Sequence, residues 1–177
     1  MKTVIRLFFS LLVGVSIYSC EEDTDNVSEI DGTFQVKLNG RPLSLDSIRV
    51  EYSENSSQHK LDLFGFFTDY DSIGLPLNSK FDMELVEKLS TFNTEFEDDV
   101  LQQATYTANG IPDFKQDTKL NSPLFETGSF RNYTQGFVFL TGMDAEDLTV
   151  TGYFNLLSSD STVLSGNFYK VQYTIDD

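Results

Sequence analysis

The sequence has few of the residues on which small exported proteins and metalloproteins often depend. It contains no tryptophan, one histidine (His59) and one cysteine (Cys20) among 177 residues. A single cysteine cannot form an intramolecular disulfide, so a folded domain must be stabilised by its core alone. A metal site built from histidine and cysteine would need partners that the chain lacks. We therefore interpret His59, which lies in a polar stretch, as an ordinary loop or strand-start histidine.

Positive charge is also scarce. The chain has 12 Lys and Arg against 28 Asp and Glu, a formal net charge of −16. Such a surface repels nucleic acid and anionic membranes, and it attracts cations or basic partners. The composition therefore predicts no nucleic-acid partner.

The first segment contrasts with the rest of the chain. Lys2 and Arg6 precede an eleven-residue apolar run, Leu7 to Ile17, and Cys20 follows three residues later. The run is shorter than the ~20 residues needed to span a bilayer, so it predicts a cleaved export signal over residues 1–19. Removing that signal takes away two cations and no anions, and the formal net charge becomes −18.

The end of this segment resembles the lipoprotein signal of diderm bacteria. Ser19 stands where such signals have a small residue, and Cys20 stands where the lipidated cysteine becomes the mature N-terminus. The bulky Tyr18 departs from the commonest pattern and matches relaxed versions found in Bacteroidetes. The resemblance implies a membrane anchor of several acyl chains on Cys20, including palmitate. An ordinary secretory signal that ends near a cysteine is the alternative.

An acidic run follows the cysteine directly. Glu21, Glu22 and Asp23 resemble the surface-export signal of Bacteroidetes lipoproteins, which implies an outer-membrane protein that faces the cell exterior. Residues 20–31 are also polar and carboxylate-rich, so a disordered, solvated tether explains the same residues. Both interpretations are compatible.

The remaining residues, 32–177, are predicted to form one all-β domain. Polar and apolar residues alternate in several short segments that are separated by turn dipeptides such as Asn39-Gly40. Seven to nine strands and short acidic or Ser-rich linkers favour an antiparallel β-sandwich or a barrel-like domain. Residues 84–103 also fit a short helical stripe, although we favour a strand at 80–86, and residues 113–127 are predicted to be a loop. The expected strands are 33–38, 48–52, 61–67, 80–86, 104–108, 136–141, 148–156 and 164–175.

The last of these strands carry a second resemblance. The segments Val150 to Phe154 and Leu164 to Tyr173 contain Gly-x-Phe patterns similar to the terminal hairpin of small uncharacterised Bacteroidetes lipoproteins with a β-sandwich-like domain. That family implies no known activity. Alternation in 148–156 places Leu148, Val150, Gly152, Phe154 and Leu156 on one face, which we predict to be buried together with Phe168.

Three tripeptides resemble the O-glycosylation acceptor of exported Bacteroidetes proteins, in which Asp precedes Ser or Thr. The candidate acceptors are Ser47, Ser72 and Ser161, each at a predicted turn or loop edge. Asp-Ser pairs also begin ordinary turns, and that alternative stays open.

The sequence offers other chemistry only weakly. Asp69, Asp71 and Gly74 match part of a calcium-loop pattern, but Ile73 and Lys80 break it, so no metal site is predicted. Many carboxylates could serve glycoside hydrolysis, yet nothing marks one pair above the rest. Tyrosines could replace tryptophan as platforms for sugars. The tyrosines considered for that role are Tyr52, Tyr70, Tyr106 and Tyr133.

These observations predict a lipid-anchored cell-envelope protein that displays a β-domain for binding a glycan or an envelope protein. We expect no enzymatic activity and no cofactor. A structural accessory subunit of an envelope complex is the main alternative, and a small glycan-active hydrolase is the third.

Overall fold

The computed structural model describes residues 31–70, 73–90, 95–96, 99–109, 113–122 and 129–176. Within them the chain forms eleven strands and no helix, so the all-β prediction is confirmed. The strands are β1 (Thr33–Leu38), β2 (Arg41–Leu43), β3 (Ser47–Asn55), β4 (Gln58–Tyr70), β5 (Pro76–Lys88), β6 (Thr105–Tyr106), β7 (Phe114–Ser122), β8 (Ser129–Asp144), β9 (Thr149–Ser158), β10 (Val163–Gln172) and β11 (Thr174–Ile175).

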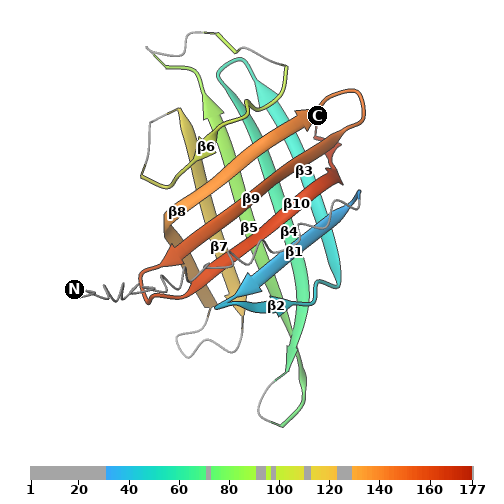
Figure 1. Ribbon diagram of the computed structural model, residues 1–177, viewed down its shortest axis with the longest axis vertical. Helices are drawn as coiled ribbons and strands as arrows, with labels where there is room; N and C mark the ends of the chain where they lie inside the picture. Colours follow the sequence, from blue (N-terminus) through green and yellow to red (C-terminus); the bar gives the residue numbers. More distant parts are fainter. Residues whose placement is uncertain are drawn as a thin grey trace, which may run out of the picture.

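All eleven strands belong to one sheet, in the order β11-β3-β4-β5-β7-β8-β9-β10-β1-β2, with β6 paired to β8. Every neighbouring pair is antiparallel except β11 and β3, which pair in parallel over two residues each. The sheet curls so that β8, β9, β10 and β1 cross obliquely in front of β3, β4, β5 and β7 (Figure 1). The result is a half-barrel, which is the barrel-like alternative of the sequence prediction.

The two walls of the half-barrel meet through a group of phenylalanines. Phe81 on β5 stacks on Phe154 of β9 with ring centroids 5.8 Å apart, and Phe34 of β1 stacks on Phe168 of β10 at the same distance. Phe34 and Phe81 lie 6.0 Å apart and connect the two stacks. All four rings are buried. Burial of aromatic area against the opposite wall is what keeps a single curled sheet closed over its core.

The Gly-x-Phe patterns have a direct structural explanation. In the register of β9 with β10, Phe154 lies opposite Gly166 and Phe168 lies opposite Gly152. Each ring covers the glycine across from it: a Cβ added to Gly166 would lie 2.6 Å from Phe154 Cζ, and one added to Gly152 would lie 2.5 Å from Phe168 Cζ. Only glycine fits beneath these rings. We call these two contacts the Gly–Phe pairs.

The predicted register of β9 is confirmed. Val150, Gly152, Phe154 and Leu156 are buried, and Leu148, just before the strand, is partly buried against the core. Phe168 lies on the same buried side. The turn at 39–40 also forms as expected, with φ of 50° at Asn39 and 76° at Gly40.

The prediction of a loop at 113–127 is wrong for its first part, because β7 occupies Phe114–Ser122. Its inward-facing positions are polar as well as apolar. Gln116, Thr118 and Ser122 are buried beside Leu120, so the strand shows no alternation of hydrophobicity. These side chains are satisfied internally: Gln116 Nε2 donates to the Tyr133 carbonyl at 3.0 Å, and Thr118 Oγ1 donates to Gln116 Oε1 at 2.6 Å.

The ambiguous segment 84–103 begins as a strand. β5 continues to Lys88, two residues beyond the predicted end, and no helix occurs in the described residues of 84–103. Val86 explains the helical pattern, because it is apolar and buried although it lies on the outer face of β5. The sheet also has more strands than the seven to nine expected, because β2 and β7 carry little hydrophobic signal and the expected strand 164–175 is divided into β10 and β11.

Candidate functional site

The residues predicted to anchor and export the protein cannot be placed. Cys20, Glu21, Glu22 and Asp23 lie outside the described residues, as do the predicted signal and almost all of the tether. In the part of the chain that is described, no helix has the length and apolarity needed to cross a membrane.

Two of the three candidate O-glycosylation acceptors are described, and both are exposed. Ser47 begins β3, and Ser161 lies in the turn between β9 and β10 with a φ of 64°. The third acceptor, Ser72, lies outside the described residues. The structure therefore leaves Ser47 and Ser161 accessible and does not bring them together.

The calcium-loop match is only partly described, because Asp71 lies outside the described residues. No group of three or more His, Cys, Asp or Glu side chains is placed to hold a metal ion among the residues described. The acidic segment at 144–147 forms an ordinary turn, since Asp144 Oδ1 accepts hydrogen bonds from the backbone N–H groups of Glu146 and Asp147.

Three of the four tyrosines considered as sugar platforms point into the core. Tyr52, Tyr106 and Tyr133 are at most 3% exposed and belong to the core. The side chain of Tyr70 is not described. Burial raises the pKa of Tyr133 to about 12, and it raises the pKa of Tyr52 and Tyr106 further. These residues stabilise the half-barrel and cannot stack on an external ligand.

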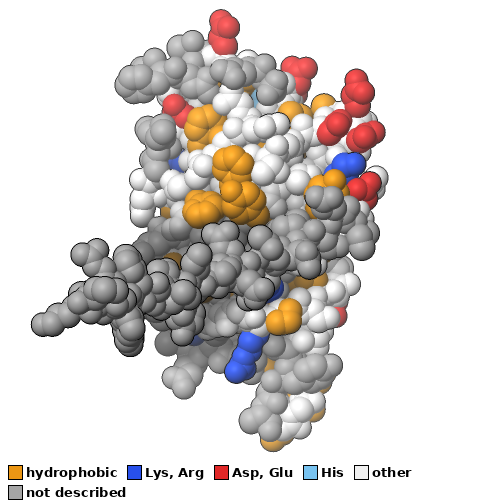
Figure 2. Space-filling view, in the orientation of Figure 1, with side chains coloured by type: hydrophobic (Ala, Val, Ile, Leu, Met, Phe, Trp, Pro, Cys, Tyr) orange, Lys and Arg blue, Asp and Glu red, His pale blue; other side chains and the backbone are white. Residues whose placement is uncertain are grey.

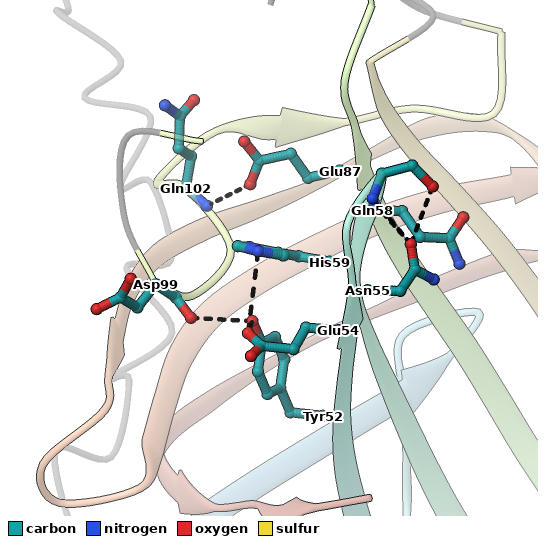
Figure 3. Close-up of polar contacts among 9 residues, drawn as sticks. Tyr52, Glu54, Asn55, Gln58, His59, Glu87, Asp99 and Gln102 are labelled. Atoms are coloured by element: carbon teal, nitrogen blue, oxygen red, sulfur yellow. Dashed lines mark hydrogen bonds and ion pairs between the residues drawn. The ribbon is translucent and has the colours of Figure 1, made fainter. Parts of the chain in front are cut away.

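His59 is buried in a polar cluster at one end of the half-barrel (Figure 3). It lies on the inner face of β4, directly between Glu54 on β3 and Glu87 on β5. Its Nε2 is 4.0 Å from Glu54 Oε2, and its ring stacks on Phe96 with centroids 3.7 Å apart. The position of His59 near the start of β4 agrees with a strand-start histidine. The polar sequence around it did not indicate that its side chain is buried.

The carboxylates of this cluster hold a loop in place. Glu87, which is fully buried, accepts a 3.0 Å hydrogen bond from the backbone N–H of Gln102. The Tyr52 hydroxyl lies 2.9 Å from Glu54 Oε2 and 3.0 Å from the Asp99 carbonyl oxygen, so it can donate to either. Tyr106 donates to the Gln102 carbonyl at 3.0 Å. The segment 99–106 is thereby tied across the end of the sheet.

Among the described residues of this cluster, no hydroxyl or thiol is hydrogen-bonded to His59. Within the described chain, His59 Nδ1 has no hydrogen-bond partner, and its Nε2 faces a carboxylate and not a hydroxyl or thiol. Closure of the barrel end accounts for the contacts of Glu87, Tyr52 and Tyr106.

A groove lies on the outer surface of the front wall. The outer face of β8, β9, β10 and β1 carries two rows of side chains that run across the four strands. The first row is Phe139, Tyr153, Asn167 and Gln35, and the second is Phe137, Asn155, Ser165 and Lys37. Seven of these eight residues line a groove of about 380 Å³, together with Phe154 and Gly166. The eighth, Phe139, lies beside Tyr153 at the edge of the groove. We call this surface the outer groove.

The outer groove has an aromatic half and a polar half. Tyr153 is 45% exposed and Phe137 is 36% exposed, and the Tyr153 ring contacts Phe137 edge-on at 6.0 Å and Phe139 at 5.4 Å. Figure 2 shows a hydrophobic patch on this face, over the strands that Figure 1 labels β8 and β9. The polar half contains the amides Gln35, Asn155 and Asn167. Asn167 Oδ1 is buried and has no hydrogen-bond partner within the described part of the chain.

Sequence alternation already places Tyr153 on the outward face, but it does not reveal the groove. The two rows depend on the pairing of β1 with β10. This pairing sets Gln35 beside Asn167, although the two residues are 132 positions apart in the sequence. Comparison with protein-family models, with curated proteins and with solved structures found no match. The fold and the outer groove therefore define the class of this protein: a curled single-sheet β-domain with an aromatic and amide-lined surface groove.

Proposed function

We propose that this protein is a non-enzymatic, lipid-anchored component of the cell envelope that displays its half-barrel to bind a glycan or a protein partner. The anchor is Cys20 at the end of a short apolar run, and the adjacent acidic residues direct the protein to the outside of the outer membrane. The observation that supports binding is the outer groove, where two aromatic side chains stay exposed beside three amide side chains.

The physical argument is that exposed aromatic pairs are unusual on a monomeric surface with no ligand to cover them. Phe137 and Tyr153 are two of five large hydrophobic residues that stand exposed in the described chain, and they contact each other. Clustered aromatic side chains bordered by polar groups are characteristic of recognition surfaces. A domain held to the membrane through its N-terminus leaves such a surface free to meet a ligand.

The anchor is tested by metabolic labelling with an alkyne fatty acid in a Bacteroidetes host. The wild-type protein should be labelled and Cys20→Ala should not, because the thiol is the only acceptor for the thioether-linked lipid. Equal labelling of both would refute the anchor. Replacing Glu21, Glu22 and Asp23 by alanine should preserve labelling but reduce cleavage by protease added to whole cells. Unchanged cleavage would leave the acidic run as a plain tether.

A second candidate function is an accessory subunit that accepts a strand from a partner. The observation that favours it is the edge of β3, a nine-residue strand whose outer edge is covered by only two residues of β11 in the described chain. An exposed strand edge can accept an extended segment of another protein. Cross-linking from a photoreactive residue at Ser47, on this exposed edge, would capture a partner if this function holds.

A further inference from the structure

We propose that the outer groove is a saccharide-binding site that takes a short, uncharged oligosaccharide. This inference rests on the proposed function and names the ligand class and the residues that would bind it. Tyr153 with Phe137 would form the stacking platform, and Asn155, Asn167 and Gln35 would bond the hydroxyl groups.

The platform fits a sugar ring because of its orientation. Tyr153 projects outward from β9, between Phe139 in its own row and Phe137 at the diagonal, and its ring remains 45% exposed. The apolar C–H face of a sugar packs on an aromatic face in the same way that other apolar groups do. Phe137 meets Tyr153 edge-on, at an interplanar angle of 86°, and so limits how the Tyr153 ring can turn. The platform is therefore rigid before a ligand arrives.

The polar half has the hydrogen-bonding capacity that hydroxyl groups require. A sugar hydroxyl both donates and accepts, and an amide side chain offers two donors and an acceptor. Asn167 lies directly beside Tyr153 across the β9–β10 pairing, and Asn155 follows two positions along β9 on the same face. Asn167 Oδ1 is buried, and no donor reaches it from the residues that the structure describes. A turn of this amide toward the groove, with a sugar hydroxyl as donor, would satisfy it.

The charge of the outer groove favours a neutral ligand. The nine residues that line the groove include one cation, Lys37, and no carboxylate, although the chain has 28 Asp and Glu. An otherwise acidic surface that is free of carboxylates at one groove suits a ligand rich in hydroxyl groups and without charge of its own. A basic partner would gain nothing from binding here.

The size of the outer groove favours a saccharide over a protein. Two rows spanning four strands cover roughly 14 Å by 7 Å, from the spacing of strands and of residues along them. A stable protein interface buries about 800 Å² on each partner, several times this area. The groove can hold a small ligand, whereas a protein would need contacts well beyond it.

The experiment uses the full chain, purified from membranes in a detergent without a sugar headgroup, such as lauryldimethylamine oxide. The protein is applied to an array of neutral oligosaccharides, and the best binder is titrated by isothermal calorimetry. We expect Tyr153→Ala to weaken its affinity at least tenfold, and Asn155→Ala to weaken it several-fold. Tyr153→Phe keeps the platform and should stay within about threefold.

The matched control is Phe64→Ala. Phe64 lies on the outer face of β4, on the other wall, beneath Arg49 and Lys80. Its truncation should change the affinity less than twofold. Thermal melting of each variant checks the fold, and Asn155, which is exposed, gives a test that does not depend on core packing.

Three results would overturn the inference. The first is an anchored protein that binds no oligosaccharide on the array, which leaves the proposed function standing with a protein as ligand. The second is full affinity in both Tyr153→Ala and Asn155→Ala, which places the site elsewhere. The third is an equal loss in Phe64→Ala. Failure of Cys20 labelling would instead contradict the proposed function.

Discussion

Two adjacent aromatic residues on β9 provide a direct test of how the sheet is built. Phe154 is 2% exposed and faces the core, whereas Tyr153 is 45% exposed and faces outward. Both are large rings in the centre of the same strand. We predict that Phe154→Ala lowers the free energy of unfolding by about 4–5 kcal/mol and that Tyr153→Ala lowers it by about 1 kcal/mol.

The magnitude for Phe154 follows from its surroundings. Truncation of a buried phenylalanine costs about 3–5 kcal/mol, and the cost is greater where the site cannot collapse. The ring stacks on Phe81 and contacts Phe34, whose centroid is 6.5 Å away, and aromatic pairs add about 0.5–1.5 kcal/mol. Gly166 beneath the ring has no side chain to fill the space. The upper half of the range is therefore expected.

The assay is urea denaturation followed by far-ultraviolet circular dichroism. Because Phe154→Ala removes a large part of a typical domain stability of about 5–15 kcal/mol, Phe154→Leu serves as a milder variant with an expected loss of about 1–2 kcal/mol. The slope of the transition should match that of the wild type in each case. A larger loss in Tyr153→Ala than in Phe154→Ala would mean that β9 is shifted by one residue, and the reasoning would be refuted.

Three further predictions concern Tyr133, Glu87 and Gly166. Among the described residues the buried Tyr133 hydroxyl has no hydrogen-bond partner, and burial raises the pKa of Tyr133 to about 12, so Tyr133→Phe should retain or slightly raise stability at pH 8. The pKa of Tyr133 is higher in the folded protein than in the unfolded chain. The stability linked to this difference is fully present below pH ~10 and is lost as the pH rises from about 10 to 12. In urea melts at pH 11, Tyr133→Phe should therefore lose less stability than the wild type does. Glu87→Ala should cost about 2–3 kcal/mol by leaving the Gln102 N–H unpaired, whereas Glu87→Gln should cost less because it keeps an acceptor. Gly166→Ala should cost several kcal/mol, because its Cβ would lie 2.1 Å from the Gln35 carbonyl oxygen on β1 and 2.6 Å from Phe154 Cζ, and the midpoint of thermal unfolding reports this loss.

Each of these has a clear contrary result. A large loss of stability in Tyr133→Phe at pH 8 would show that the hydroxyl is paired. Equal stability of Glu87→Ala and the wild type would show that the barrel end is held by other contacts. A neutral Gly166→Ala would show that neither the Gln35 carbonyl oxygen nor the Phe154 ring lies against this glycine.

The strands that could be predicted from sequence are those that alternate clearly. Apolar residues and glycine alternate with polar residues and Tyr153 along 148–156, and β9 forms with the expected face inward. β7 could not be predicted, because its buried positions Gln116, Thr118 and Ser122 are polar. Thr118 donates to Gln116, and Gln116 in turn donates to the Tyr133 carbonyl, 17 positions further along the chain, which no local pattern contains.

The candidate site shows the same limit. Tyr52 alternates in phase with Ile48 and Val50, and this signal could have identified it as a core residue and not a sugar platform. The alternation of 148–156 puts Tyr153 on the face opposite Val150 and Phe154, and in the structure it points outward. Its neighbours in the outer groove come from four strands, and their alignment follows from the pairings β8–β9, β9–β10 and β1–β10. Such a surface becomes visible only when the whole sheet is assembled.

The two Gly–Phe pairs also determine which mispairings of β9 and β10 are penalised. A slip of two residues keeps every side chain on its proper face, so alternation alone does not forbid it. One such slip would set Phe154 opposite Phe168, so that two rings would occupy the space of one. The opposite slip would set Gly152 opposite Gly166 and leave a void. Side-chain volume thus selects among registers that polarity cannot distinguish, and the same register sets Phe168 opposite Phe34 of β1.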